Sequence, residues 1–182
     1  MKYEDIEGWF NDKTQYFYDF LISEMPDNGI FVECGAWQGK SSAYLCDKSN
    51  NRFSIFIVDH WEGSKNEENV HKLAKETNLY LKFLENMGDR KFFPLKMESK
   101  RASECFNDNS CDIVYIDMGH TYKEVKRDIE LWLPKVKSGG YISGHDYIEY
   151  NNIDWGVVRA VDEFFGNKAK TINDCWFYQK HN

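Results

Sequence analysis

Five short apolar runs with helical patterns between them constrain the fold of this chain more than any other feature. The runs are rich in Ile, Val, Phe and Tyr and lie at 30–34, 53–58, 92–95, 112–117 and 140–144. Strands that are apolar along their whole length are buried on both faces, and helices between strands form crossover connections. The sequence therefore predicts an α/β fold with a mostly parallel sheet and helices on both of its faces.

The helical segments show apolar side chains three and four positions apart. Residues 5–25 have this spacing and stop at a Pro-Asp-Asn-Gly turn, so residues 1–28 are expected to form an N-terminal helix that precedes the sheet. The stretch 121–133 carries one apolar stripe opposite a charged face. A further helix is expected at 154–166, with Asp154 as its N-cap and a glycine at its end.

The last two strand-like segments, 169–172 and 175–179, are separated by only Asn173 and Asp174. This pattern is typical of an antiparallel hairpin and brings the expected sheet to seven strands. At 182 residues the chain is long enough for one sizeable core, and no Pro-, Gly- or Ser-rich linker divides it. We expect a single domain over residues 1–182.

Composition narrows the classes of partner. A formal charge of −7 without a dense basic run argues against a nucleic-acid partner held through its phosphates, so a small-molecule substrate fits better. The chain has no apolar run near the ~18 residues of a membrane span, and its start lacks the features of a secretory signal. The five cysteines show no CxxC spacing and are expected to be reduced core thiols. We expect a cytoplasmic protein without a membrane partner.

The segment 31–42 runs from an apolar strand through two glycines into the start of a helix. Gly35 and Gly39 allow a sharp turn, and the first N–H groups of the helix can hold a carboxylate or phosphate, although a plain strand-to-helix connection has the same pattern. The spacing is GxxxG and lacks the GxGxxG of a dinucleotide site. Trp37 and Gln38 would crowd a pyrophosphate, so the loop disfavours a nicotinamide dinucleotide.

Polar residues follow every one of the five apolar runs. Because the carboxyl ends of parallel strands meet at one edge of a sheet, these residues are expected to lie together, although a solvated loop position would explain any one of them. An acidic residue after the second strand, Asp59, suits the two hydroxyls of a ribose. The residues at the five strand ends are Glu33, Asp59-His60, Glu98-Ser99, Asp117 and His145-Asp146.

Together these motifs resemble a class I S-adenosylmethionine-dependent methyltransferase, and within that class the small-molecule O-methyltransferases of the catechol and macrocin type. The resemblance extends from about 30 to 180. Residues 31–42 look like the first methyltransferase motif and Ile57-Val58-Asp59 like the second. The second half of the chain is similar in order and spacing to the second half of that family's sequences. The matching residues are 112–117, Gly119-His120-Thr121-Tyr122, Asp128, Leu133-Pro134 and 139–147.

The resemblance implies a Rossmann-like methyltransferase fold and a binding role for several residues. Gly35 and Gly39 would line the methionine part of S-adenosylmethionine, Ser41 would bind its carboxylate and Asp59 its ribose. Glu98 and Ser99 would lie near the adenine. The remaining residues that the resemblance adds to the cofactor-binding set are Glu33, Ala36, Trp37, His60 and Asp117.

In metal-dependent members of the family, an acidic residue after the fourth strand and an adjacent pair after the fifth hold Mg²⁺. The resemblance therefore implies a metal site at Asp117, His145 and Asp146. Those relatives usually have aspartate at the position of His145, and Mg²⁺ prefers oxygen ligands. The histidine favours either no Mg²⁺ or another divalent cation such as Mn²⁺, Fe²⁺ or Zn²⁺.

Methyl transfer to oxygen requires that the protein orient a hydroxyl group and remove its proton. A metal at Asp117 and Asp146 would lower the pKa of that hydroxyl; without a metal, His145 or His120 would act as general base. His120 also opens a helix and has an equally simple structural explanation there. The sequence leaves these alternatives open, and the catalytic candidates are Asp117, His120 and His145.

We therefore expect an S-adenosylmethionine-dependent O-methyltransferase for a small hydroxylated acceptor, a sugar or a phenol. The alternatives are a nicotinamide-dependent oxidoreductase and a methyltransferase-like binding subunit without turnover. The polar stretch 59–68 is either a flap over the ligand or a surface loop, and 147–152 is a candidate wall of the acceptor pocket. Trp61 and Trp155 are candidates for contact with the adenine or the substrate, although packing at a helix start would also explain Trp155. Without a separate acceptor-recognition domain, a homo-oligomer that completes the site is a further expectation.

Overall fold

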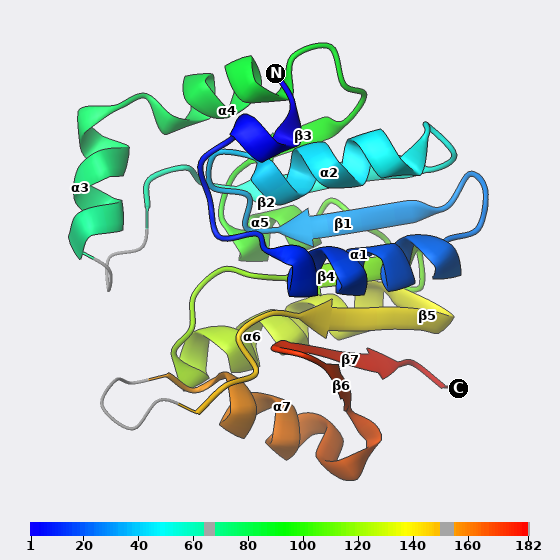
Figure 1. Cartoon of the computed structure of the whole chain (residues 1–182). Coiled ribbons are helices and arrows are strands. Elements are labelled where there is room, and N and C mark those ends of the chain that lie inside the picture. Colours follow the sequence, from blue (N-terminus) through cyan, green and yellow to red (C-terminus); the bar gives the residue numbers. More distant parts are fainter. Residues whose placement is uncertain (64–67, 150–154, 182) are drawn as a thin grey trace.

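The computed structural model describes residues 1–63, 68–149 and 155–181, and its centre is a seven-stranded sheet (Figure 1). The strand order is β3-β2-β1-β4-β5-β7-β6. Strands β1 to β5 pair in parallel, whereas β7 runs antiparallel to both β5 and β6. This confirms the predicted Rossmann-like sheet with its C-terminal hairpin. The strands are β1 (Ile30–Cys34), β2 (Ser54–Asp59), β3 (Phe93–Lys96), β4 (Cys111–Ile116), β5 (Val136–Gly144), β6 (Lys170–Ile172) and β7 (Cys175–Gln179).

The helices in the described part of the chain cover both faces of the sheet, as predicted. Alternate strand residues point to opposite faces, so Phe31 packs in the core beneath α1, α2 and α4, while Val32 packs in the core beneath α5, α6 and α7. Figure 1 shows α1 in front of the strands. The helices are α1 (Asp12–Glu24), α2 (Lys40–Ser49), α3 (Glu68–Glu76), α4 (Leu79–Met87), α5 (Ser99–Ser103), α6 (Tyr122–Trp132) and α7 (Val157–Phe165).

The N-terminal helix starts later than the sequence predicts. Residues Tyr3–Asp5 form a short 3₁₀ turn, and α1 begins only at Asp12. The cause is Asn11, whose side chain accepts hydrogen bonds from the backbone N–H groups of Lys13 and Thr14 and so caps α1 there. The helix expected at 154–166 is α7, which follows Gly156; the predicted cap Asp154 lies outside the described residues.

The carboxyl ends of the central strands lie level with one another. Cys34 at the end of β1 is in register with Val58 on β2 and Ile116 on β4, and Ile116 is in register with Gly144 on β5. The residues that follow these strands therefore share one edge of the sheet.

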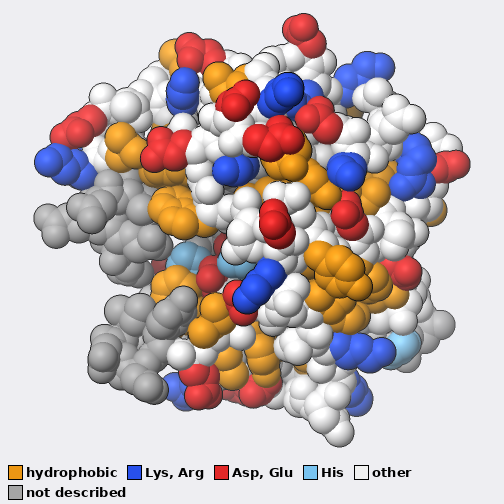
Figure 2. Space-filling view, in the orientation of Figure 1, with side chains coloured by type: hydrophobic (Ala, Val, Ile, Leu, Met, Phe, Trp, Pro, Cys, Tyr) orange, Lys and Arg blue, Asp and Glu red, His pale blue; other side chains and the backbone are white. Residues whose placement is uncertain are grey.

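The surface combines charges of both signs. Figure 2 shows acidic and basic side chains interspersed over the face on view, with a gathering of hydrophobic side chains among them. No helix within the described ranges is long and apolar enough to cross a membrane.

Candidate functional site

The two glycines of the loop after β1 are required by the packing of the loop itself. Gly35 has φ +94°, and a Cβ atom there would lie 1.7 Å from the main-chain oxygen of Asp117. Gly39 has φ +93°, and its Cβ would lie 2.9 Å from the ring of Phe83. Both positions combine a left-handed backbone with close contact, so only glycine fits. The loop is thus pressed against the end of β4, where Asp117 begins the next loop.

Asp59 anchors this loop from the end of β2. Its Oδ2 accepts hydrogen bonds from the backbone N–H groups of Ala36 (2.9 Å) and Trp37 (3.1 Å), and its Oδ1 accepts from the N–H of Trp61 (2.7 Å). Trp37 has φ +49°, a strained conformation for a bulky residue, and its carbonyl accepts from Nε1 of Trp61 (2.9 Å). The Asp59 carboxylate is half-buried and therefore reaches the surface of the site.

Glu33 lies beneath the loop and is fully buried. Its carboxylate accepts hydrogen bonds from the Tyr18 hydroxyl on α1 (2.7 Å) and from the Ser42 hydroxyl on α2. Burial raises the pKa of Glu33 to about 7, while the hydrogen bonds from Ser42, Ser41 and Tyr18 oppose that rise. Glu33 therefore joins α1, β1 and the start of α2 and does not reach solvent.

Replacing Glu33 by glutamine should change the pH dependence of stability. Between pH 4.5 and about 7 the unfolded chain releases a proton that the native carboxyl keeps, so stability falls as the pH rises, by roughly 3 kcal/mol in total. Above that window Glu33 is ionised in both states and contributes no further loss. Urea unfolding at pH 5 and pH 8 should show a fall about 3 kcal/mol smaller in E33Q than in wild type, because glutamine does not titrate. The remaining fall comes from His120 and His145, whose raised pKa values also stabilise the native state at the lower pH.

The matched control is Glu98→Gln, since Glu98 is exposed. E98Q should keep the wild-type fall between pH 5 and pH 8. An equal fall in E33Q and wild type would show that Glu33 has an ordinary pKa.

The start of α2 lies beside the same loop. The first N–H groups of a helix have no intrahelical partner, and here they belong to Lys40, Ser41 and Ser42. Ser41 is half-buried, whereas the Ser42 hydroxyl is committed to Glu33. This turn offers N–H donors for a carboxylate, and Asp59 offers an acceptor for hydroxyl groups. An amino-acid nucleoside such as S-adenosylmethionine needs both kinds of group.

The residues predicted near the adenine point in different directions. Glu98 is exposed, whereas Ser99 is buried and its hydroxyl accepts a hydrogen bond from Nε1 of Trp132 (2.9 Å). His60 is half-buried, and its Nδ1 accepts from the backbone N–H of Glu62 (2.9 Å). The structure therefore places the Ser99 side chain in the core beside α6 and leaves Glu98 and His60 at the surface.

The loops after β4 and β5 bring two carboxylates and an imidazole together. Potential ligand atoms of Asp117, His120 and Asp146 all lie within 4.8 Å of one another. His120 Nε2 is 3.1 Å from Asp146 Oδ2 and 3.9 Å from Asp117 Oδ1. Among the described residues this is the cluster with the composition of a metal site. His145, which the sequence places in that site, is not part of this cluster.

His145 lies next to the cluster and makes two other contacts. Its Nδ1 is 3.2 Å from Asp146 Oδ1, and its Nε2 is 3.4 Å from the Thr14 hydroxyl oxygen on α1. The pair His145-Asp146 is held at the sheet edge by the hydrogen bond from the His145 N–H to the Ile116 carbonyl (3.2 Å), and Asp146 has φ +59°.

The charges of this edge are balanced within it. Burial lowers the pKa of His120, but the hydrogen bonds to Asp117 and Asp146 raise it more, and the net pKa is about 10. Burial also lowers the pKa of His145, and the hydrogen bond to Asp146 brings it to about 9. Burial raises the pKa of Asp146, but its bonds to both histidines hold it below the usual range. A cation at this edge would therefore displace protons.

The donor set suits a divalent cation, with two carboxylates and one imidazole from Asp117, Asp146 and His120. Mg²⁺ takes oxygen ligands, whereas imidazole nitrogen suits Mn²⁺, Fe²⁺ and Zn²⁺. The composition of the cluster thus fits Mn²⁺, Fe²⁺ or Zn²⁺ better than Mg²⁺.

The start of α7 closes one side of the cluster. The Trp155 ring stacks on the His120 ring with centroids 4.1 Å apart and an angle of 12° between planes. Nε1 of Trp155 lies 3.3 Å from the Asp146 carbonyl, and the Gly156 N–H donates to the His120 carbonyl (2.8 Å). Trp155 is therefore a wall of the site.

Trp61, the other aromatic singled out from the sequence, is buried beneath the loop instead. Its ring packs between Tyr80 and Phe83 on α4, with centroid distances of 4.7 Å to each. Parts of the two predicted ligand-covering segments, 64–67 and 150–152, lie outside the described residues.

Thr14 and Tyr18 contact site residues but were not predicted from the sequence. Thr14 contacts a residue 131 positions away and Tyr18 one 15 positions away. Both lie on the buried face of α1. A polar side chain among the apolar residues of that face is the sequence signal that could have identified them.

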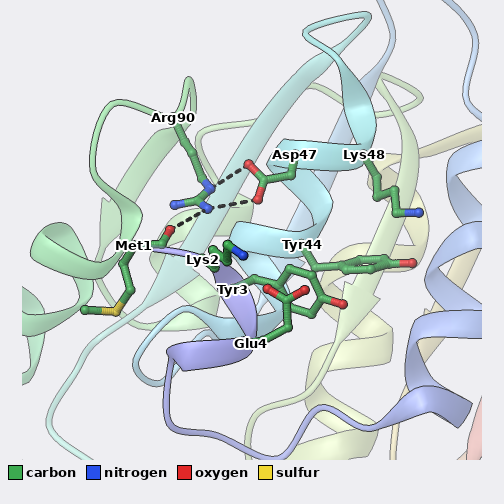
Figure 3. Close-up of a pocket in the computed structure, with 8 residues that line it drawn as sticks. All are labelled: Met1, Lys2, Tyr3, Glu4, Tyr44, Asp47, Lys48 and Arg90. Carbon is green, nitrogen blue, oxygen red and sulfur yellow. Dashed lines mark hydrogen bonds and ion pairs between the residues drawn. The ribbon is translucent and has the colours of Figure 1, made fainter.

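A separate cavity of about 590 Å³ lies between the N-terminal turn and the second half of α2 (Figure 3). Arg90 crosses it, with Nε and Nη2 each 2.8 Å from one oxygen of Asp47, and Nη2 also donates to the Met1 carbonyl (3.0 Å). The rings of Tyr3 and Tyr44 meet edge to face at 5.0 Å. The charge of Arg90 is neutralised by Asp47, and none of the strand-end residues lines this cavity.

The sequence model of a family described as a methyltransferase domain matches residues 32–147 of this chain. An uncharacterized protein of Sinorhizobium fredii (strain NBRC 101917 / NGR234) is 30% identical over 123 residues, which are 63% of this chain and 13% of that protein. The chain spans 13% and 59% of the lengths of the two curated relatives it matches.

Solved structures share the fold. A SAM-dependent O-methyltransferase from Thermotoga maritima has a TM-score of 0.60 at 13% identity, with 97% of this chain and 68% of that chain covered. An rRNA methylase from Streptococcus thermophilus has a TM-score of 0.59 at 14% identity, with 96% and 100% covered. At such identities the likeness concerns the fold alone.

Proposed function

The chain belongs to the methyltransferase-domain family and has the class I fold of S-adenosylmethionine-dependent methyltransferases, and on this premise we propose that it methylates a hydroxyl group of a small acceptor, a sugar or a phenol. The observation that carries the proposal is the convergence of two groups at one sheet edge. One is the glycine loop with Asp59, and the other is the cluster of Asp117, His120 and Asp146.

The first group supplies the cofactor site. The N–H groups at the start of α2 bind a carboxylate, and Asp59 accepts hydrogen bonds from ribose hydroxyls while it holds the loop in place. S-adenosylmethionine supplies a methyl group on a positively charged sulfur. Gly35 packs directly on the main chain of Asp117, so a ligand held by the glycine loop would lie next to the residues of the second group.

The second group handles the acceptor. Asp117, His120 and Asp146 orient a hydroxyl group. Because the pKa of His120 is about 10, its imidazole already holds a proton near neutral pH; a divalent cation bound there would displace that proton and lower the pKa of the acceptor hydroxyl. Trp155 limits the acceptor pocket on the α7 side. A planar acceptor ring would pack against such an aromatic wall.

Titration calorimetry on EDTA-treated protein tests the cofactor. We expect micromolar binding of S-adenosylhomocysteine and no binding of NAD. Each titration is repeated with Mn²⁺ and with Mg²⁺. Binding of NAD alone would favour the oxidoreductase alternative, and no binding of either would favour a binding subunit without turnover. Transfer of labelled methyl groups to phenols, sugars and an rRNA fragment then identifies the acceptor; the formal charge of −7 disfavours the RNA.

Replacing Asp146 by asparagine should reduce methyl transfer to the best acceptor by roughly 100-fold or more, because the variant loses the charge that both His120 and His145 contact. Binding of S-adenosylhomocysteine should change little, since Asp146 lies on the acceptor side. The measurement is initial rate at saturating methyl donor. Asp108→Asn, which breaks an exposed ion pair with Lys135, is the control and should keep full activity. A fully active D146N would remove Asp146 from the acceptor site.

A further inference from the structure

His145 is contacted on both ring nitrogens by residues that come from different parts of the chain. On one side, Nδ1 meets Asp146 Oδ1 at 3.2 Å, and on the other, Nε2 meets the Thr14 hydroxyl oxygen at 3.4 Å. The Thr14 residue is only 4% exposed, and the His145 side chain is 16% exposed. The Thr14 contact is therefore largely shielded from water.

Asn11 determines which way the Thr14 hydroxyl points. Its Oδ1 accepts from the backbone N–H groups of Lys13 (2.9 Å) and Thr14 (3.2 Å) and lies 3.5 Å from the Thr14 hydroxyl oxygen. Because this amide oxygen only accepts, the Thr14 hydroxyl hydrogen points toward Asn11. The lone pairs of the hydroxyl oxygen then face His145, so the His145 Nε2–H donates to Thr14.

The start of α1 is also tied to the hairpin turn that follows β6. Asn173 Nδ2 donates to the Lys13 carbonyl (3.4 Å), and Asp174 in the same turn accepts from the backbone N–H of Tyr147 (2.9 Å). The turn thus connects Thr14's neighbour with the residue that follows Asp146. These two contacts bring the start of α1 close to the loop after β5 without using the side chain of Thr14 or His145.

We propose that Thr14 is a positioning residue that fixes the orientation of the His145 ring at the acceptor side of the site. Asp146 restrains the ring at Nδ1 and Thr14 restrains it at Nε2, so the two contacts together define the orientation of the ring. Helix α1, which precedes the segment 32–147 that the family model matches, is then part of the site. The value of this orientation for catalysis rests on the proposed function, whereas the orientation itself does not.

The test is ring-nitrogen NMR of the metal-free, full-length protein. In wild type, the His145 Nε2 proton should exchange with water more slowly than that of His60, and H145Q assigns its signals. Thr14→Val keeps the shape and removes the acceptor, so it should shift the His145 Nε2 resonance and speed this exchange. The resonances of His60 and His181 should stay in place. Thr14→Ser restores the hydroxyl and should restore the wild-type spectrum.

The matched control is Asn173→Gly, which removes the hydrogen bond from the Asn173 side chain to the Lys13 carbonyl but leaves the Thr14 hydroxyl. It should leave the His145 resonance closer to wild type than T14V does. An unchanged His145 signal in T14V, or a T14S spectrum equal to that of T14V, would overturn the proposal. If T14V does not fold, Thr14→Ala and the wild-type exchange rate decide the question. Since no methyl donor or acceptor is used, a failed cofactor titration would not alter this result.

Discussion

Replacing Gly35 by alanine should destabilise the domain by roughly 4 kcal/mol or more, which lowers the melting temperature by about 8–16 °C for a chain of this size. Two costs add. The backbone at Gly35 has φ +94°, which an L-residue adopts at a cost of about 1–2 kcal/mol. The new Cβ would also lie 1.7 Å from the Asp117 carbonyl oxygen, so the ends of β1 and β4 must move apart by more than an ångström.

Gly139→Ala separates these two costs. Gly139 also has positive φ, +82°, but a Cβ there would have no atom within 4 Å. G139A should therefore show only the backbone cost, about 1–2 kcal/mol. Thermal and urea unfolding of both variants provide the comparison. Equal losses in G35A and G139A would mean that the contact between the glycine loop and Asp117 does not constrain the domain.

The fold could be predicted closely because each central strand carries its own signal. Apolar runs rich in β-branched residues identify buried strands without knowledge of their partners, and helices between them fix parallel connections. The start of α1 could not be predicted this way. The apolar spacing continues back to Ile6, yet Asn11 caps the helix at Asp12, and Ile6 and Phe10 are buried from non-helical backbone. Apolar periodicity records burial and does not distinguish these conformations.

The candidate site was predictable where it follows from strand ends and not where it depends on side-chain direction. Asp117 and Asp146 converge because β4 and β5 are in register. Ser99 and Glu98 are neighbours in the sequence, but one side chain enters the core to meet Trp132 and the other faces solvent. The contact of Thr14 with His145 joins residues 131 positions apart, and no local pattern encodes it.

Replacing Asp59 by asparagine should weaken the binding of S-adenosylhomocysteine by roughly 100-fold, which corresponds to about 2.7 kcal/mol. The carboxylate accepts three backbone N–H groups through two oxygens, those of Ala36 and Trp37 on Oδ2 and that of Trp61 on Oδ1. Asparagine keeps one acceptor oxygen, and its NH₂ group takes the place of the other oxygen. There it faces backbone N–H groups, which are donors too and cannot bond to it. The loop therefore loses part of its anchor, and the ribose loses its acceptor.

Asp112→Asn is the matched control for this change. Asp112, on β4, also accepts a backbone N–H, that of Ile30 (2.8 Å), and pairs with Lys137, but it lies at the amino ends of β4 and β1. D112N should lose stability and keep its affinity for S-adenosylhomocysteine. Amide exchange at Ala36 and Trp37, measured without ligand, should be faster in D59N than in D112N. Wild-type affinity in D59N, with faster exchange at Ala36, would restrict Asp59 to anchoring the loop, because a ribose acceptor cannot be lost without a cost in binding.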